Sequence, residues 1–218
     1  IEAAREESVE TVLSLAETRR DGAQLVVTGC MAERYGPELA QAVPEADLVA
    51  GFGVPVTLGR RPGSEPPVPS FDLLNLPRPA ATAPWAYVKV AEGCDRTCGF
   101  CAIPSFRGPQ RSRTPESILD EVDALDVQEI VLVAQDLASY GRDVGQRGAI
   151  VPLVAAVAER VPRTRLLYLY PSDLTDELVD VVGATGVPYF DLSLQHVSKP
   201  LLRRMRRWGD GARFLARL

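Results

Sequence analysis

The stretch AEGCDRTCGFCAIP, residues 91–104, decides the fold, because it places three cysteines within eight residues. Cys94, Cys98 and Cys101 are separated by three and two residues. Thiolates are preferred ligands of iron-sulfur clusters, and Gly93 gives the backbone freedom to fold around one. A fourth cysteine is missing from the stretch, so a four-iron cluster bound here keeps one iron open to a ligand from outside the protein.

Outward from this stretch, short apolar runs alternate with helical patterns. The sequence predicts four strands, at 87–90, 130–134, 166–170 and 190–194, and three helices between them, at 115–125, 153–160 and 174–182. Thr114 is expected to cap the first helix, and Ser172 or Asp173 the last. Parallel strands need right-handed crossovers, so this βαβαβαβ order predicts part of an α/β barrel or a doubly wound sheet. Four strands do not close a barrel.

The amino-terminal part of the chain predicts a separate α/β unit. Its patterns indicate a helix over 1–20, a strand over 24–28, a helix over 37–42 and a strand over 47–50. Cys30 is expected in a turn at the carboxyl end of the first strand, where ligands usually bind. Eight of the 18 prolines lie in 54–84, which reads as a linker. The predicted domains are therefore 1–53, the linker 54–84, and 85–218.

Composition narrows the class of protein. The chain is 46% hydrophobic and 24% charged, which is typical of a globular protein, and its net charge of -5 argues against direct nucleic-acid binding. An apolar run long enough to span a membrane and a basic-then-apolar leader are both absent, so we expect a cytoplasmic protein. Cytosolic thiols stay reduced, which favours metal ligands over disulfides. Zinc is the alternative metal, although its sites usually have four ligands in paired spacings.

The spacing C-x-x-x-C-x-x-C after a first barrel strand resembles the radical S-adenosylmethionine (SAM) superfamily. More narrowly, a cysteine-bearing α/β unit, a proline-rich linker and a barrel that begins AYVKVAEGC resemble the methylthiotransferases, over essentially the whole chain. The resemblance implies that this chain contains the carboxyl-terminal part of that family's amino-terminal domain, followed by about four of the six β/α units of a radical SAM barrel. The chain starts at Ile1 and stops within a helical pattern at Leu218, so both ends are expected to be cut.

Three further stretches separate two branches of this family. AQDLASYGRD (134–143), DLSLQH (191–196) and LYLYP (167–171) are similar to the branch that modifies an aspartate of a small-subunit ribosomal protein. The branch that modifies isopentenyladenosine in tRNA favours Gln-Asn where this chain has Gln135-Asp136, and it tends to place Ser-Gly after the glutamine that corresponds to Gln195. This tRNA branch is kept as the alternative. A zinc-binding or iron-sulfur structural module is the alternative that is not an enzyme; simple electron carriers usually have four cysteines for each cluster.

The resemblance also implies the chemistry. Cys94, Cys98 and Cys101 hold a 4Fe-4S cluster whose open iron binds SAM, and one electron cleaves SAM to a 5'-deoxyadenosyl radical that removes hydrogen from the target carbon. Cys30 matches the last of three ligands of a second 4Fe-4S cluster that delivers sulfur, and a second SAM supplies the methyl group. The implied partners are a small-subunit ribosomal protein as substrate, a one-electron reductant and a sulfur donor. The chain alone is expected not to complete the full reaction.

Other polar residues receive weaker assignments. Gln135, Asp136 and Gln195 are expected at the carboxyl-terminal rim of the barrel, where barrels bind ligands, as contacts to cofactor or substrate. His196 is assigned no catalytic role, because a lone histidine at a strand end is as often structural. The last helix is expected to carry a solvated basic face, with contact to an acidic substrate as the alternative; its residues are Arg203, Arg204, Arg206 and Arg207.

Overall fold

The computed structural model describes residues 2–52, 54, 56, 74 and 81–217. The chain divides into two compact units, 1–73 and 74–218, which we treat separately. Most of the linker predicted at 54–84 lies outside the described residues. Among the described helices, none has the length and apolar character needed to cross a membrane.

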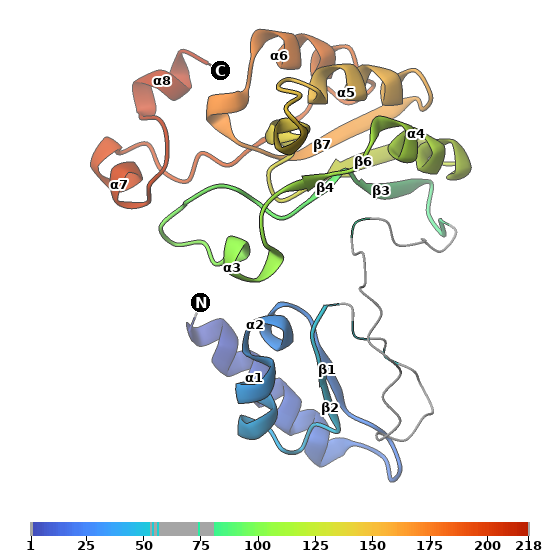
Figure 1. Ribbon diagram of the computed structural model, residues 1–218, viewed down its shortest axis with the longest axis vertical. Helices are drawn as coiled ribbons and strands as arrows, with labels where there is room; N and C mark the ends of the chain where they lie inside the picture. The colour runs from blue at the N-terminus through green and yellow to red at the C-terminus, as the bar shows by residue number, and fades with distance from the viewer. Residues whose placement is uncertain (1, 53, 55, 57–73, 75–80, 218) are drawn as a thin grey trace. The chain divides into compact units, whose positions relative to one another are not determined.

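The first unit is a small α/β layer structure. Its elements are α1 (Glu2–Thr18), β1 (Val26–Thr28), α2 (Cys30–Ala42) and β2 (Leu48–Ala50). The two strands pair in parallel, as the sequence predicted, with Val27 opposite Val49. Val27 and Leu39 are buried at the centre of the unit, and Val9 of α1 packs against them. The two strands and two helices drawn in Figure 1 therefore pack together through a small apolar cluster, to which α1 contributes half-buried side chains only.

Helix α2 begins at Cys30, seven residues before the start that the sequence predicted. It is two helical segments joined at a kink at Tyr35, where φ is -123° and ψ is 17°. Pro37 follows the kink, and a proline inside a helix removes one backbone donor and disturbs the preceding turn. The sequence pattern therefore revealed the second segment only. Cys30 is an exposed first residue of a helix and not part of a turn.

The second unit is built on a four-stranded parallel sheet in the order β3-β6-β7-β8. The strands are β3 (Trp85–Lys89), β6 (Glu129–Val133), β7 (Arg163–Leu169) and β8 (Phe190–Leu192), and the helices that connect them are α4 (Pro115–Ala124), α5 (Ile150–Ala158) and α6 (Asp176–Gly183). Every predicted strand and helix of this unit is present, with bounds that differ by a few residues. The partial β/α-barrel order predicted from the sequence is confirmed.

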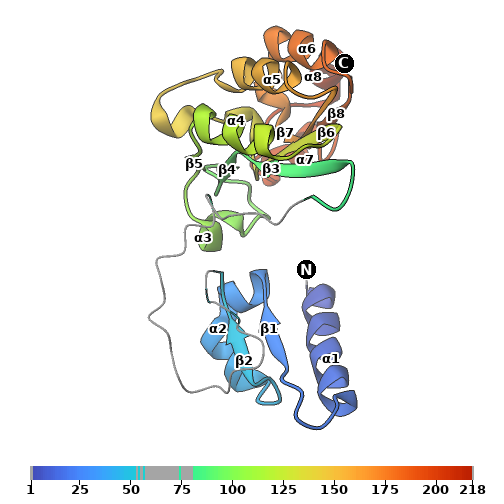
Figure 2. The same cartoon turned by 90° about the vertical axis from the view of Figure 1, so that its right-hand side faces the viewer.

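Helices α4, α5 and α6 cover one face of this sheet, as both views show (Figures 1 and 2). Alternate residues of the strands, such as Val88, Ile130 and Leu166, are completely buried against them. Each such aliphatic side chain contributes about 1.5–3 kcal/mol by leaving water. On β3 the residues between point away from the helices, and Trp85 and Tyr87 stay exposed there. Coverage of one face only is the arrangement of a segment of a β/α barrel.

The cap predictions had mixed outcomes. Thr114 caps α4, because its side chain accepts the backbone N–H of Ser117. The expected cap of α6 by Ser172 or Asp173 is wrong: Thr175 caps it, and the other two residues belong to the short helix η3 (Pro171–Asp173).

Short elements without a periodic pattern were missed by the sequence analysis. They are β4 (Ala91–Glu92), β5 (Arg111–Ser112), α3 (Ile103–Arg107), and the 3-10 turns η1 (Leu137–Ser139) and η2 (Arg142–Val144). The helical pattern expected at the carboxyl end of the sequence is present as two short helices, α7 (Lys199–Arg204) and α8 (Gly211–Leu215). Strands β4 and β5 pair antiparallel and enclose the segment that carries the three cysteines. A two-residue strand has too few positions to show alternation, which is why the pattern did not reveal it.

Candidate functional site

The cysteine loop, residues 94–101, is anchored by its own backbone as it leaves β4. The N–H of Cys94 donates to the carbonyl oxygen of Gly108 at 3.1 Å. Gly93, just before it, has φ +84°, and a Cβ at this position would lie 2.1 Å from the carbonyl oxygen of Pro109. Only glycine fits this backbone, because the conformation is left-handed and the neighbouring chain is too close for any side chain. The loop therefore starts from a fixed point.

Two of the three thiols receive hydrogen bonds from arginines. The backbone N–H of Arg96 donates to Cys94 Sγ at 3.4 Å, and Arg207 Nη1 donates to Cys98 Sγ at the same distance. Cys101 follows on the same turn, since its N–H donates to the carbonyl of Cys98 at 3.2 Å. Donors directed at sulfur stabilise the thiolate form, which is the form that binds iron.

Burial acts in the opposite direction on Cys94, whose side chain is 7% exposed. Burial raises the pKa of the Cys94 thiol above its ordinary value, and the nearby charge of Asp136 and the Cys101 thiol add to this, while the N–H and the charge of Arg96 lower it. In the protein without metal, Cys94 is therefore held as a neutral thiol. Binding of iron would replace its proton.

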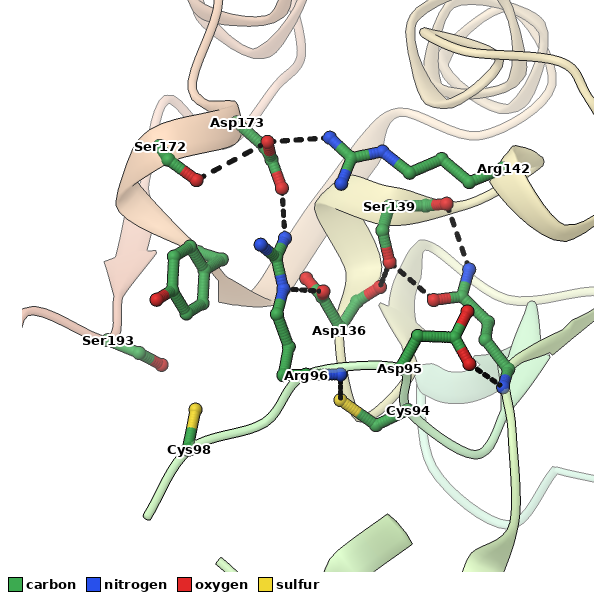
Figure 3. A network of polar contacts seen from close by, with 12 residues as sticks. Cys94, Asp95, Arg96, Cys98, Asp136, Ser139, Arg142, Ser172, Asp173 and Ser193 are labelled. Atoms are coloured by element: carbon green, nitrogen blue, oxygen red, sulfur yellow. Dashed lines mark hydrogen bonds and ion pairs between the residues drawn. The ribbon is translucent and has the colours of Figure 1, made fainter. Parts of the chain in front are cut away.

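Arg96 is the central side chain behind the loop (Figure 3). Its Nε donates to Asp136 at 2.5 Å, and its Nη2 pairs with Asp173. Arg142 pairs with the second oxygen of Asp173 at 2.6 Å. Burial alone would lower the pKa of Arg96, but the hydrogen bonds and charges of Asp136 and Asp173 outweigh it and raise the pKa. The guanidinium also lies 3.8 Å from the ring centroid of Tyr170.

The structure places two of the predicted rim residues directly behind the cysteine loop. Asp136 is buried and bound to Arg96, and Gln135 Nε2 donates to Glu92 at 3.3 Å. One oxygen of each, Asp136 Oδ1 and Gln135 Oε1, is buried with no hydrogen-bond partner. Such atoms cost about 1–3 kcal/mol unless they are satisfied, so they mark a place that a donor group of a ligand would fit.

Gln195 is different, because it is exposed and stands three residues beyond the end of β8, with φ +70°. Its predicted contact with cofactor or substrate stays a prediction. His196 is exposed as well, and its Nδ1 accepts the backbone N–H of Ser198 at 2.8 Å, which is a local structural contact. The fourth strand ends at Leu192, earlier than the sequence predicted.

The prediction that four arginines form one solvated face on the last helix is wrong. Helix α7 ends at Arg204, and α8 follows it. Arg203, Arg204 and Arg206 are exposed, as a solvated face requires, but Arg207 is half-buried and turned toward the cysteine loop. The reason is the end of α7, where Arg206 adopts φ +53° and the N–H of Arg207 donates to the carbonyl oxygen of Leu202 at 2.8 Å, so Arg207 no longer continues the helix. Sequence alone did not distinguish Arg207 from its neighbours.

A second buried carboxylate supports the start of the loop. Glu92 is 1% exposed and is paired with Lys89 Nζ at 2.7 Å and with Arg107 Nη1 at 2.9 Å. These ion pairs tie β3, β4 and α3 together on either side of the cysteines. Removing one partner of such a buried pair costs about 3–5 kcal/mol, because the remaining charge is left without compensation.

The three thiols of the loop suit an iron-sulfur cluster better than a zinc ion. Over the part of the chain that the structure describes, no three His, Cys, Asp or Glu side chains converge closely enough to hold one metal ion. The sequence of the second unit contains three cysteines, all in the loop. Three thiols spread along a loop, two of them with N–H donors, fit the ligand set of a cuboidal cluster better than a closed tetrahedral zinc site.

The comparisons with known proteins agree with this site. A family model described as "Radical SAM superfamily" matches residues 88–218, and one described as "Uncharacterized protein family UPF0004" matches residues 1–51. These matches fall on the two units. They confirm the superfamily to which the cysteine spacing pointed.

Curated relatives named "Ribosomal protein uS12 methylthiotransferase RimO" match along the chain. The identity is 38% in Kineococcus radiotolerans, 40% in Saccharopolyspora erythraea and 35% in Helicobacter pylori strain G27. The matches cover 100%, 99% and 99% of this chain and 55%, 53% and 52% of the relatives, in the same order. The chain thus spans about half the length of these relatives, and its resemblance to the methylthiotransferases of the ribosomal-protein branch is confirmed.

Among solved structures, the radical S-adenosylmethionine methyltransferase TsrM from Kitasatospora setae, with cobalamin and a 4Fe-4S cluster bound, matches 60% of this chain and 27% of its own. The identity is 15% and the TM-score 0.47, so this likeness carries no weight in the argument.

Proposed function

Because this chain belongs to the radical SAM superfamily, we propose that Cys94, Cys98 and Cys101 hold a 4Fe-4S cluster that binds and cleaves SAM. The observation that carries the proposal is a loop with three thiols, and no fourth, which follows the first strand of the sheet in the sequence. When bound, the cluster supplies the electron for reductive cleavage of SAM, whose product after hydrogen abstraction is 5'-deoxyadenosine.

These residues position the groups around the loop. Gln135 and Asp136 each present a buried oxygen without a partner, and these acceptors suit the amino and hydroxyl donors of SAM. Arg96 keeps the Asp136 carboxylate in place through its 2.5 Å contact. Burial of this corner keeps water from competing for the two unpartnered oxygens, so a ligand donor bound there makes a stronger hydrogen bond. Gln195 is proposed as a further contact from the exposed end of β8.

The substrate belongs to the proposal as well. The relatives carry the name of a ribosomal protein uS12 methylthiotransferase, so we propose that the complete reaction adds a methylthio group to an aspartate of that small-subunit protein in the cytoplasm. It needs a one-electron reductant, a sulfur donor and a second SAM for the methyl group. Cys30 is proposed as one ligand of the second, sulfur-delivering cluster. Modification of tRNA in place of uS12 would identify the other branch.

The first test is anaerobic reconstitution of the 218-residue chain with iron and sulfide. We expect a brown protein that forms 5'-deoxyadenosine from SAM under a strong chemical reductant. Cys98→Ala should lose both the cluster and this product. Cys30→Ala is the matched control, because it removes a thiol from the other unit and should keep both. Unchanged iron content in Cys98→Ala, or a colourless protein that retains zinc, would refute the assignment.

A further inference from the structure

Two arginines lie against the ring of Tyr170 at the cysteine loop. The guanidinium carbon of Arg96 is 3.8 Å from the ring centroid and that of Arg207 is 4.0 Å from it. Both distances are well inside the range of a cation–π contact, and the ring is 8% exposed, so little water weakens the attraction. We call these three residues the Tyr170 stack. It joins Arg96 of the cysteine loop to two residues that follow it by 74 and 111 positions in the sequence, Tyr170 and Arg207.

The two arginines of the stack differ in charge balance. Arg96 is neutralised by the carboxylates of Asp136 and Asp173. Arg207 has a different set of contacts: its Nη1 donates to Cys98 Sγ at 3.4 Å, and its Nη2 donates to the carbonyl oxygen of Ser193. Of the carboxylates among the described residues, none lies within ion-pair distance of Arg207. Its full positive charge therefore acts on the thiol of Cys98.

The backbone after α7 holds Arg207 in this place. The N–H of Gly99, inside the cysteine loop, donates to the carbonyl oxygen of Met205 at 2.9 Å. On the other side of Arg207, the N–H of Trp208 donates to the Tyr170 hydroxyl at 3.2 Å. Arg206 between them adopts φ +53°, a left-handed conformation that a residue with a Cβ keeps only where neighbouring contacts impose it. The turn is thus built to direct Arg207 inward.

We propose that Arg207 is a positioning residue of the cysteine loop, which fixes the Cys98 sulfur and stabilises the electron that the cluster accepts. The inference rests on the proposed cluster. Hydrogen bonds to the sulfurs and nearby charge are among the factors that set the potential of an iron-sulfur centre. Reduction adds one negative charge, and an uncompensated guanidinium in a half-buried place lowers the energy of that charge more than a solvated one does. Arg207 therefore makes the cluster easier to reduce.

The first experiment compares Arg207→Gln with Arg204→Gln in the reconstituted chain. Both variants remove one positive charge, but Arg204 is exposed, so it controls for net charge. Electron paramagnetic resonance at fixed applied potentials gives the ratio of reduced to oxidised cluster. We expect Arg207→Gln to lower that ratio about tenfold, which corresponds to about 59 mV for a one-electron couple, and Arg204→Gln to leave it nearly unchanged. Equal ratios in the two variants would overturn the electronic role.

The second experiment uses the protein without metal, so it does not depend on the proposed cluster. Hydrogen exchange of the Gly99 amide reports whether the loop stays bound to Met205. We expect protection to fall about tenfold in Arg207→Gln and in Tyr170→Leu, since about 1.4 kcal/mol of contact is lost. Tyr170→Phe keeps the ring but removes the acceptor of the Trp208 N–H, so its protection should fall less than in Tyr170→Leu. Arg207→Lys, which keeps the charge without the planar group, should also be intermediate.

The two experiments separate the failure of this inference from the failure of the proposed function. If no cluster assembles in the unaltered chain, the proposed function is wrong, and hydrogen exchange alone decides whether Arg207 positions the loop. If the cluster assembles and cleaves SAM, while Arg207→Gln changes neither the reduced fraction nor the protection of Gly99, the positioning role is wrong and the proposed function stands.

Discussion

Gly93 offers the sharpest test of how the cysteine loop is built. The residue has φ +84°, and a Cβ there would meet three backbone atoms, at 2.1 Å from Pro109 O and 2.7 Å from both Gly108 O and Pro109 C. Backbone atoms cannot move aside as a flexible side chain does. Gly93→Ala must therefore push apart the two chain segments that β4 and β5 pair, and it must break the bond from Cys94 N to Gly108 O, which is 3.1 Å long.

The expected loss of stability has two parts. A left-handed backbone costs a residue with a Cβ about 1–2 kcal/mol. Overpacking against atoms that cannot yield costs about 1–3 kcal/mol more. The sum is about 2–5 kcal/mol, a large fraction of the 5–15 kcal/mol by which a domain is typically stable. Gly145→Ala is the matched control, because Gly145 has φ +77° and nothing within 4 Å of an added Cβ, so only the first part applies.

Tryptophan fluorescence during urea unfolding gives the measurement, since both tryptophans of the chain, Trp85 and Trp208, lie in the second unit. We expect the free energy of unfolding to fall further in Gly93→Ala than in Gly145→Ala, by the overpacking cost of about 1–3 kcal/mol. After reconstitution, Gly93→Ala should also bind less iron than Gly145→Ala. Equal losses in the two variants would show that the close approach of Pro109 does not constrain the loop and would refute the reasoning.

Two further predictions concern pH. Hydrogen bonds from Arg165 and Arg163 hold the pKa of Glu129 below its ordinary 4.5, so Glu129→Gln should cost about 1 kcal/mol at pH 7. That difference in unfolding free energy should vanish as the pH falls through the lowered pKa, and a constant difference would contradict the ion pairs. Burial raises the pKa of Tyr140 to about 12, and its hydroxyl donates to Arg113 O at 2.7 Å. Tyr140→Phe should cost about 1 kcal/mol at pH 7, because the hydrogen bond to Arg113 is lost. The native chain should lose stability as the pH rises from 10, the ordinary pKa of tyrosine, to about 12, and Tyr140→Phe should not show this loss. The absorbance of tyrosinate in alkaline solution measures the titration.

The sequence was sufficient to predict the repeating β/α units of the second unit. Runs such as 130–134, which became β6, are apolar because they are buried in a parallel sheet, and their alternation with helical patterns determines the crossovers. The cysteine loop was equally accessible, because its ligands are neighbours along the chain. Helix α2 was only half recognised, since the kink at Tyr35 interrupts the pattern on which the prediction depended.

The contacts that hold the loop were beyond sequence reasoning for a physical reason. Arg96 and Asp173 are 77 residues apart, and Cys98 and Arg207 are 109 residues apart. A periodic pattern describes one element and its nearest turns, so it contains no information on which side chain of a distant turn enters a site. Arg207 also stands among three exposed arginines, and a positive φ at Arg206 separates it from them. Composition cannot reveal that conformation.

The same contacts bear on the order in which the site forms. In a zinc finger the fold depends on the metal, because nothing else holds the ligands together. Here contacts within the protein hold the loop as well: the Gly108 carbonyl accepts the Cys94 N–H, the Met205 carbonyl accepts the Gly99 N–H, and Arg207 donates to Cys98 Sγ. Burial meanwhile raises the pKa of Cys94, so the closed loop carries less negative charge than three thiolates would. These contacts are therefore expected to order part of the loop before a cluster binds, and protection of the Gly99 amide from hydrogen exchange in the protein without metal would show it.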